Sequence, residues 1–202
     1  MRFVEWSKVL DEFQKPYSYF KTSTGANEYI MEITPIGDFL MCTTNAFLSS
    51  FKRKLKPCSP RALNDAYAFF SAVYDMYRSE AALQLIYMPA DDTFFWYVPM
   101  QRVAPATVTF SRYEGEGYIV ADLHSHGGFS AFFSSVDNRD EKGTSLFGVI
   151  GNINTNKPTT VWRAGCHGTF KNLDDLHCLF GKGNAGYIDL DIDEAMKCVH
   201  TF

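Results

Sequence analysis

The sequence lacks an apolar run long enough to span a bilayer, and its N-terminus has no signal-peptide pattern. The net charge of its 202 residues is −4, so no basic surface indicates a nucleic-acid partner. Regularly spaced cysteine pairs are also missing, because the five cysteines are odd in number and irregular in spacing, which is typical of reduced thiols. We therefore expect a cytoplasmic protein that binds neither nucleic acid nor membrane.

The composition is that of an ordinary globular protein, with 46% hydrophobic and 21% charged residues. This length is enough for one domain with a full core, or for a core domain with an extension. Aromatic residues make up 16% of the chain. They fit either a core rich in Phe and Tyr or a surface with aromatic anchors for a protein partner, and composition alone leaves both open.

We expect residues 1–58 to form an N-terminal extension. Within it, residues 3–10 predict a short helix, and the apolar segments 29–33 and 39–42 predict a hairpin around a turn. The basic run at residues 51–56 is interpreted as a solvated linker. The extension has three open roles: a lid, a partner-binding element, or part of the core sheet.

From residue 59 onwards the chain alternates helical and strand patterns. Ser59-Pro60 predicts a helix start, and apolar residues at helical spacing then favour an amphipathic helix at 60–79. This order of elements indicates an α+β fold. The further elements that we expect are strands at 82–88, 94–98, 107–110, 118–122, 146–150, 159–164, 168–171 and 187–190, a short helix at 134–142, and a terminal helix.

The most specific pattern is His124-Ser125-His126, followed by Ser134 and Asp137 in the form H-x-H-x7-S-x2-D. Two imidazoles and one carboxylate are a zinc ligand set that leaves a fourth position open, as catalytic sites do. If the chain is extended at the histidines, both imidazoles leave the same face of the strand and reach one metal. The alternative is a pair of loop histidines that bind no metal.

This spacing resembles the JAMM (MPN+, JAB) metalloprotease family, whose members cleave ubiquitin and ubiquitin-like proteins from their conjugates. The resemblance covers residues 60–172. It implies a cytidine-deaminase-like α+β fold with a central mixed β-sheet flanked by helices, in a catalytic domain over residues 59–202 that continues as a C-terminal extension after about residue 172.

The resemblance also implies roles for single residues. One zinc ion would be bound by the two histidines and Asp137, and Ser134 would stabilise the transition state. From the residues alone, Ser134 is equally a helix N-cap, and Ser135 is an alternative hydroxyl.

The family uses an upstream glutamate as general base, at a junction between a helix and a strand. Glu80 occupies that junction here and is the only acid between Asp75 and Asp91. The alternative is an ordinary charged residue at a helix end, although an acid is mildly unfavourable there.

The sequence departs from the common family pattern near the motif. Gly127-Gly128 and Phe133 stand where prolines are frequent, and the strand after Glu80 ends in Tyr87-Met88-Pro89 rather than in glycine. In this form the motif resembles bacterial members, in particular those of the PRTRC cassette. That narrower resemblance implies a ubiquitin-like protein or its conjugate as partner, together with ThiF/E1-like and E2-like proteins of the same cassette.

The predicted function is a zinc-dependent isopeptidase or peptidase acting at the C-terminus of a ubiquitin-like protein. The segments Phe94–Val98 and Gly127–Phe133 are the expected walls of its binding site, where an extended peptide would lie as an added strand. The alternatives are a non-catalytic MPN scaffold and a zinc hydrolase of a small-molecule or amino-acid-carrier substrate.

A second group of metal-binding residue types follows the motif. Its spacing fits no C-x2-C pattern, so scattered core or surface residues are the default interpretation and a second zinc site the alternative. The members of this group are Cys166, His167, His177, Cys178, Cys198 and His200.

Overall fold

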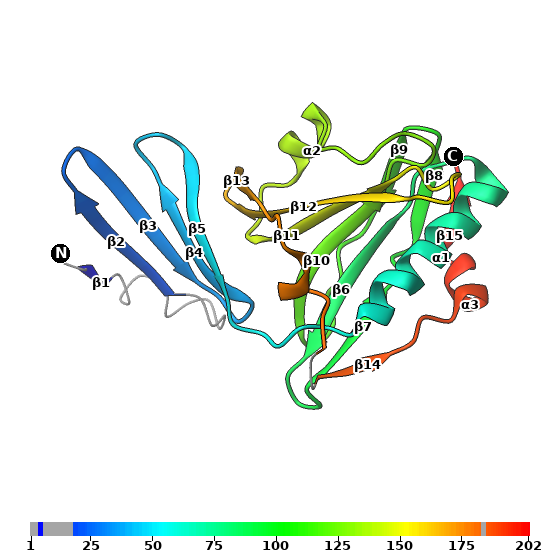
Figure 1. Cartoon of the computed structure of the whole chain (residues 1–202), viewed down its shortest axis with the longest axis horizontal. Coiled ribbons are helices and arrows are strands. Elements are labelled where there is room, and N and C mark those ends of the chain that lie inside the picture. The colour runs from blue at the N-terminus through cyan, green and yellow to red at the C-terminus, as the bar shows by residue number, and fades with distance from the viewer. Residues whose placement is uncertain (1–3, 6–17, 183–184) are drawn as a thin grey trace.

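The computed structural model describes residues 4–5, 18–182 and 185–202, and Figure 1 shows them arranged as three β-sheets with few helices. A seven-stranded sheet of parallel and antiparallel pairs forms the centre, a five-stranded sheet lies to one side, and a three-stranded sheet lies near the C-terminus. The predicted α+β class with a central mixed sheet is confirmed.

The central sheet has the order β13-β12-β11-β10-β6-β7-β14. Strand β10 is in its middle, antiparallel to β6 on one side and parallel to β11 on the other. The strands of this sheet are β6 (Ala82–Met88), β7 (Thr93–Tyr97), β10 (Tyr118–Ser125), β11 (Ser145–Gly151), β12 (Thr159–Cys166), β13 (Thr169–Asn172) and β14 (Gly186–Ile188).

Helix α1 (Pro60–Tyr77) covers one face of the central sheet, as Figure 1 shows. Ser59 caps its start by accepting a hydrogen bond from the Arg61 backbone N–H, and proline follows at the first helical position. The helix ends where Arg78 takes the left-handed conformation, with φ of 52°. The chain turns at Arg78, and this turn brings Glu80 close to the end of β10, where the candidate site lies.

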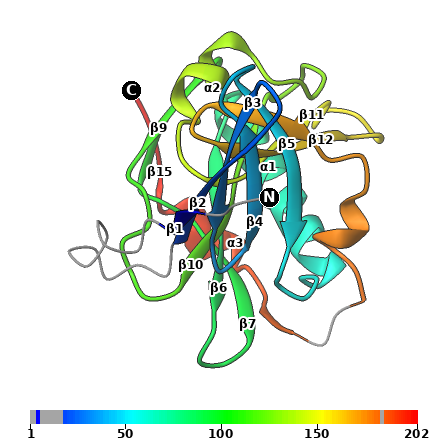
Figure 2. The same ribbon diagram turned by 90° about the vertical axis from the view of Figure 1, so that its left-hand side faces the viewer.

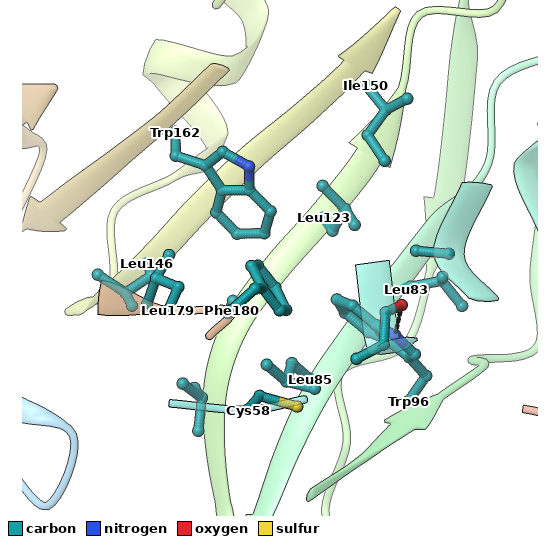
Figure 3. Packing of buried hydrophobic residues seen from close by; sticks show 14 of the residues in the cluster. Cys58, Leu83, Leu85, Trp96, Leu123, Leu146, Ile150, Trp162, Leu179 and Phe180 are labelled. Atoms are coloured by element: carbon teal, nitrogen blue, oxygen red, sulfur yellow. Dashed lines mark hydrogen bonds between the residues drawn. The ribbon is translucent and has the colours of Figure 1, made fainter. Parts of the chain in front are cut away.

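The core lies between α1 and the central sheet, and Figure 3 shows part of it. Trp96 of β7 packs beside Phe180, and its indole N–H donates to the Ala62 carbonyl oxygen at 2.7 Å. Trp162 of β12 also packs against Phe180. The residues labelled there are Cys58, Leu83, Leu85, Trp96, Leu123, Leu146, Ile150, Trp162, Leu179 and Phe180, all 5% exposed or less. A buried layer of this size fixes the sheet against the helix.

Five antiparallel strands make up the N-terminal sheet, which lies nearest the viewer in Figure 2. The predicted hairpin is present as the pair β3–β4, whereas its neighbours on both sides were not predicted. The expected helix at residues 3–10 lies almost wholly outside the described residues, and its two described residues are strand. The strands are β1 (Val4–Glu5), β2 (Ser18–Thr24), β3 (Asn27–Ile33), β4 (Gly37–Cys42) and β5 (Phe47–Arg53).

The interpretation of residues 51–56 as a solvated linker is wrong for its first half. Phe51 to Arg53 belong to β5, and the Phe51 ring packs against Phe39 with centroids 4.7 Å apart. Lys52 is exposed whereas Phe51 beside it is partly buried, an alternation along the strand that the dense positive charge obscured.

The remaining elements lie around the site and at the C-terminus. Sequence patterns predicted β9 but not the other two strands of the sheet β15-β8-β9. The domain boundaries near residues 58 and 172 stay predictions. The helices α2 and α3 agree with the two short helices that were expected. These elements are β8 (Gln101–Ala104), β9 (Thr107–Phe110), α2 (Ser135–Asp140), the 3-10 helix η2 (Leu176–Cys178), α3 (Ile192–Met196) and β15 (Val199–Thr201).

Among the described residues, no helix combines the length and apolar character needed to cross a membrane.

Candidate metal centre

The two histidines of the motif lie together at the end of β10. His124 is in the strand, and His126 continues it, since its backbone N–H donates to the Ile150 carbonyl of β11. The extended chain sends both rings to one face, and their Nε2 atoms are 3.2 Å apart. The residue between them, Ser125, points into the opposite face and is 1% exposed.

Ser125 connects the motif to the segment that carries Glu80. Its backbone N–H donates to the Ala81 carbonyl, and its hydroxyl accepts a hydrogen bond from the Ala81 N–H at 3.0 Å. Glu80 itself donates its backbone N–H to the Ala104 carbonyl of β8. These bonds hold the helix-to-strand junction beside the histidines.

The third member, Asp137, is in the first turn of α2. Its Oδ1 atom is 3.3 Å from His124 Nε2, and its Oδ2 atom is 3.9 Å from His126 Nε2. The Oδ2 atom also accepts a hydrogen bond from the Ser134 backbone N–H at 2.5 Å, which completes a capping box with the Ser134 hydroxyl. One carboxylate therefore faces the histidines while helix capping fixes its orientation.

The spacing of these ligand atoms fits a tetrahedral zinc ion. Zn–N bonds of about 2.0 Å at tetrahedral angles place two ligand atoms about 3.3 Å apart. The ligand atoms of His124, His126 and Asp137 all lie within 4.8 Å of one another, and the two closest pairs are 3.2 and 3.3 Å apart. The donor set also suits zinc, because two imidazoles and one carboxylate leave a position for water.

The ionisation states favour a cation at this place. Burial lowers the pKa of His126 to about 4, helped by the neighbouring His124, so its ring is neutral and able to ligate at neutral pH. Burial alone would raise the pKa of Asp137, but its contacts with His124 and Ser134 outweigh burial and hold that pKa well below its usual range. An ionised carboxylate thus faces a neutral imidazole.

Glu80 lies beyond the end of α1, so it is not the charged helix end that one interpretation allowed. Burial raises the pKa of its carboxyl to about 7, His124 lowers it, and Asp137 raises it further. A carboxyl with a pKa near neutrality in a cavity is poised to take and return a proton.

Ser134 is the N-cap of α2, as the first of its two interpretations required. Its hydroxyl oxygen accepts hydrogen bonds from the backbone N–H groups of Val136 and Asp137, both at 3.2 Å. A hydroxyl has one hydrogen to donate in addition to its acceptor sites, and these two bonds do not use it. Capping therefore leaves the hydroxyl able to donate to another oxygen.

All five predicted site residues line one open cavity of about 710 Å³. Carboxylates outnumber cations along its walls, since Asp122, Asp140 and Glu141 join Glu80 and Asp137 against Arg112 and Lys142. Exposed apolar side chains are also part of the lining: Phe110, Phe129, Phe132 and Val136. The cavity thus combines acidic lining residues, suited to a cation, with an exposed apolar rim, suited to a protein segment.

One of the two expected walls is present and the other is wrong. Phe129 and Phe132 of the loop Gly127–Phe133 line the cavity, and the Phe132 ring meets the His126 ring at 4.6 Å. The segment Phe94–Val98 does not line it, because Phe94 and Trp96 of β7 are buried in the core. Strand β9 supplies that wall instead.

The backbone explains why glycine replaces proline after the second histidine. Gly127 has φ of +54°, which proline cannot adopt, and a Cβ atom there would come 2.9 Å from the Tyr74 ring. The loop then crosses closely over Gly151, where a Cβ atom would come within 2.4 Å of the loop backbone. Glycine rather than proline therefore fits the backbone of this loop, and none of the ligand residues is affected.

Sequence reasoning missed Asp122, which is in the cavity two residues before His124. It accepts a hydrogen bond from the Gln84 amide at 2.5 Å, and Arg112 is 3.7 Å away. The period-two rule for strands was the available signal, because it sends Asp122 and His124 to the same face.

Comparison with known proteins gives a match over the part of the chain that contains the motif. Residues 72–165 match the model of a family described as prokaryotic homologs of the JAB domain. The matched segment contains Glu80, both histidines, Ser134 and Asp137. A search of curated proteins gives no match.

Proposed function

We propose that this chain, whose residues 72–165 match the model of prokaryotic homologs of the JAB domain, contains a JAB-type domain that acts as a zinc-dependent peptidase or isopeptidase. The substrate is a peptide or isopeptide bond at the C-terminus of a ubiquitin-like protein or its conjugate. The observation that carries this proposal is the convergence of three metal-ligand atoms and Glu80 in one cavity.

His124, His126 and Asp137 hold the ion in this proposal. A zinc ion bound there supplies a Lewis acid that lowers the pKa of water from ~15.7 toward ~7, which makes hydroxide available at neutral pH. The chain contributes a preformed ligand geometry, because strand pairing fixes the histidines and the capping box fixes the carboxylate.

Glu80 is the proton carrier in this proposal. Its raised pKa, about 7, allows it to take a proton from water and to return it to the leaving amine within one cycle. The Ser134 hydroxyl donates its free hydrogen to the oxyanion that forms on the substrate carbonyl. A single donor of this kind contributes about 10²–10³ in rate.

The rim of the cavity favours an extended protein tail as substrate. Strand β9 (Thr107–Phe110) lines the cavity and is the last strand of the sheet β15-β8-β9, so one of its edges has no partner among the described strands. An extended peptide bound along that edge would form backbone hydrogen bonds and bring its end to the ligands. The exposed Phe129 and Phe132 would hold its side chains.

The proposed substrate also indicates which other proteins would be partners. ThiF/E1-like and E2-like proteins activate and conjugate ubiquitin-like proteins, and in this proposal they make the conjugate that the JAB-type domain cleaves. A small-molecule substrate is less favoured, since the cavity is open and its apolar rim is exposed.

The test is cleavage of a fusion in which a ubiquitin-like protein carries a short reporter peptide on its C-terminus. We expect the zinc-loaded protein to release the reporter at the fusion junction, as mass spectrometry would show. Glu80→Gln should reduce the rate by about 10²–10⁴. The matched control is Glu114→Gln, which changes an exposed acid outside the cavity and should leave the rate unchanged.

If fully zinc-loaded protein binds the fusion but does not cleave it, the proposed peptidase activity is contradicted. A non-catalytic MPN scaffold is then favoured. Equal rates for wild type and Glu80→Gln would remove Glu80 from the mechanism while leaving the metal centre in place.

A further inference from the structure

A second group of metal-ligating side chains lies where the N-terminal sheet meets the central sheet. Glu32 comes from β3, and Cys166 and His167 come from the end of β12 and its turn into β13. The contact between β5 and the strands β12 and β13 brings the two sheets together, and Figure 1 shows them side by side. The chain separation between Glu32 and Cys166 is 134 residues.

The three side chains converge on one point. The Glu32 Oε2 atom is 3.0 Å from His167 Nε2 and 3.3 Å from Cys166 Sγ, and the three ligand atoms lie within 4.8 Å of one another. Glu32 is 3% exposed and Cys166 is 1% exposed. His167 is half exposed, so the group is open to solvent on one side.

We propose that Glu32, Cys166 and His167 bind a transition-metal ion of the zinc class, which links the N-terminal sheet to the JAB-type domain. This site is separate from the metal centre at His124 and does not depend on the proposed peptidase activity.

The distances fit such an ion. Zn–S bonds of about 2.3 Å and Zn–N or Zn–O bonds of about 2.0 Å place a tetrahedral N–O pair about 3.3 Å apart and an S–O pair about 3.5 Å apart. The observed separations of 3.0 and 3.3 Å need only a few tenths of an ångström of adjustment. Solvent on the His167 side provides a fourth ligand and an entry path.

The ligand chemistry selects the kind of ion. Sulfur and imidazole nitrogen suit zinc, cobalt and copper, whereas magnesium and calcium require oxygen ligands. Binding displaces one proton from the Cys166 thiol and any proton on His167 to solvent. The resulting thiolate and the Glu32 carboxylate together balance a divalent charge. The Thr144 hydroxyl, which donates to Glu32 at 2.8 Å, would orient the carboxylate from outside the ligand set.

Among the other residues of the second sequence group, the site does not extend to His177, Cys198 or His200, none of which belongs to a metal-ligating group among the described residues. The side chain of Cys178 is outside the described part of the chain. In the sequence, only the residue types of Cys166 and His167 pointed to a second site, and nothing indicated Glu32, which folding alone brings to them.

The same three side chains can also interact with one another without a metal ion. In that form Glu32 accepts hydrogen bonds from Thr144 and the Cys166 thiol and forms an ion pair with His167. This hydrogen-bonded cluster would hold the two sheets together without any ion, so the experiment must distinguish the two.

Cobalt(II) loading of the full-length, metal-free protein distinguishes them. The centre at His124 contains no sulfur ligand, so a thiolate-to-cobalt charge-transfer band in the near ultraviolet would come from a cysteine site alone. We expect wild type to show this band and to bind about two cobalt ions per chain, one for each ligand group. Cys166→Ser should lose the band and one ion.

Two controls complete the test. His124→Ala should lose one ion and keep the band, and Cys198→Ser should keep both ions and the band. Wild type that binds one ion, without a charge-transfer band, and loses it in His124→Ala would overturn the second site in favour of the hydrogen-bonded cluster. Loss of the band in Cys198→Ser rather than in Cys166→Ser would also overturn it. Both outcomes concern metal binding at Cys166, so neither would contradict the proposed cleavage at the His124 centre.

Discussion

Glu80 illustrates at the scale of one residue how a functional group costs stability. Its carboxyl has a pKa of about 7 in the folded, metal-free protein and an ordinary value of 4.5 when exposed. Between these values the folded state holds a proton that the unfolded chain has released. The unfolded state then binds fewer protons, so the free energy of unfolding falls as pH rises from about 4.5 to about 7.

Replacing Glu80 by glutamine should remove this cost. We expect metal-free Glu80→Gln to be more stable than wild type by roughly 1–3 kcal/mol at pH 8, and equally stable at pH 4, where both states of wild type are protonated. Urea unfolding at the two pH values measures the difference, with Glu114→Gln as control. The raised pKa would be contradicted if the variant and wild type differed in free energy of unfolding by the same amount at both pH values.

Ser134 caps α2, and in the proposed mechanism its hydroxyl also stabilises the transition state, so its replacement by alanine would remove both roles. Ser134→Ala should lower the cleavage rate by about 10²–10³ through the lost hydroxyl and destabilise the protein by about 1 kcal/mol through the lost cap. Ser134→Gly has no side-chain donor but costs an N-cap only a few tenths of a kcal/mol, so it should restore stability without restoring the rate. Ser135→Ala serves as control, and a rate loss there equal to that of Ser134→Ala would move the hydroxyl role to Ser135.

At the scale of elements, α2 depends on a buried arginine from a neighbouring strand. The Arg163 guanidinium of β12 lies between the rings of Phe133 and Phe170, at 3.8 and 3.6 Å from their centroids. It donates to Glu141, just beyond the end of α2, and to the side chain of Asn138 at 2.6 Å. These contacts hold the helix that carries Asp137.

Arg163→Ala should destabilise the protein by about 3–5 kcal/mol, because it leaves Glu141 buried without its partner. It should also speed zinc release to a chelator, since Asp137 loses its fixed position. Unfolding by urea and zinc release are the two measurements, and Arg139→Ala, on the exposed face of the same helix, is the control. Unchanged zinc release in a folded Arg163→Ala protein would show that α2 is held by other contacts.

The sequence predicted the elements that carry the motif better than those that surround it. Strand β6 and the helix α1 have strong periodic patterns, and the H-x-H spacing requires an extended chain. Strand β8 was missed because it has four residues and includes a charged Arg102, and its parallel partner β15 lies nearly 100 residues further along. Short strands whose pairing is non-local leave little local signal.

At the scale of the whole molecule, the N-terminal sheet shows what could not be predicted from the sequence. Its hairpin was predictable from alternating apolar residues, but its position depends on contacts such as that of Lys171 with the Ser49 carbonyl, between residues far apart in the chain. The same holds for Glu32 beside Cys166. The described strands of residues 1–58 thus form a separate sheet that contacts β12 and β13 of the central one, and the lid and partner-binding roles stay predictions.

The central claim is that the folded chain presents His124, His126 and Asp137 as one zinc site. Zinc content by mass spectrometry, on purified wild type, His124→Ala and Glu80→Gln, tests it most directly. The account predicts that His124→Ala contains one zinc ion fewer per chain than wild type, and that Glu80→Gln contains as much as wild type. Equal zinc in wild type and His124→Ala, after saturation and removal of loosely bound metal, would contradict it.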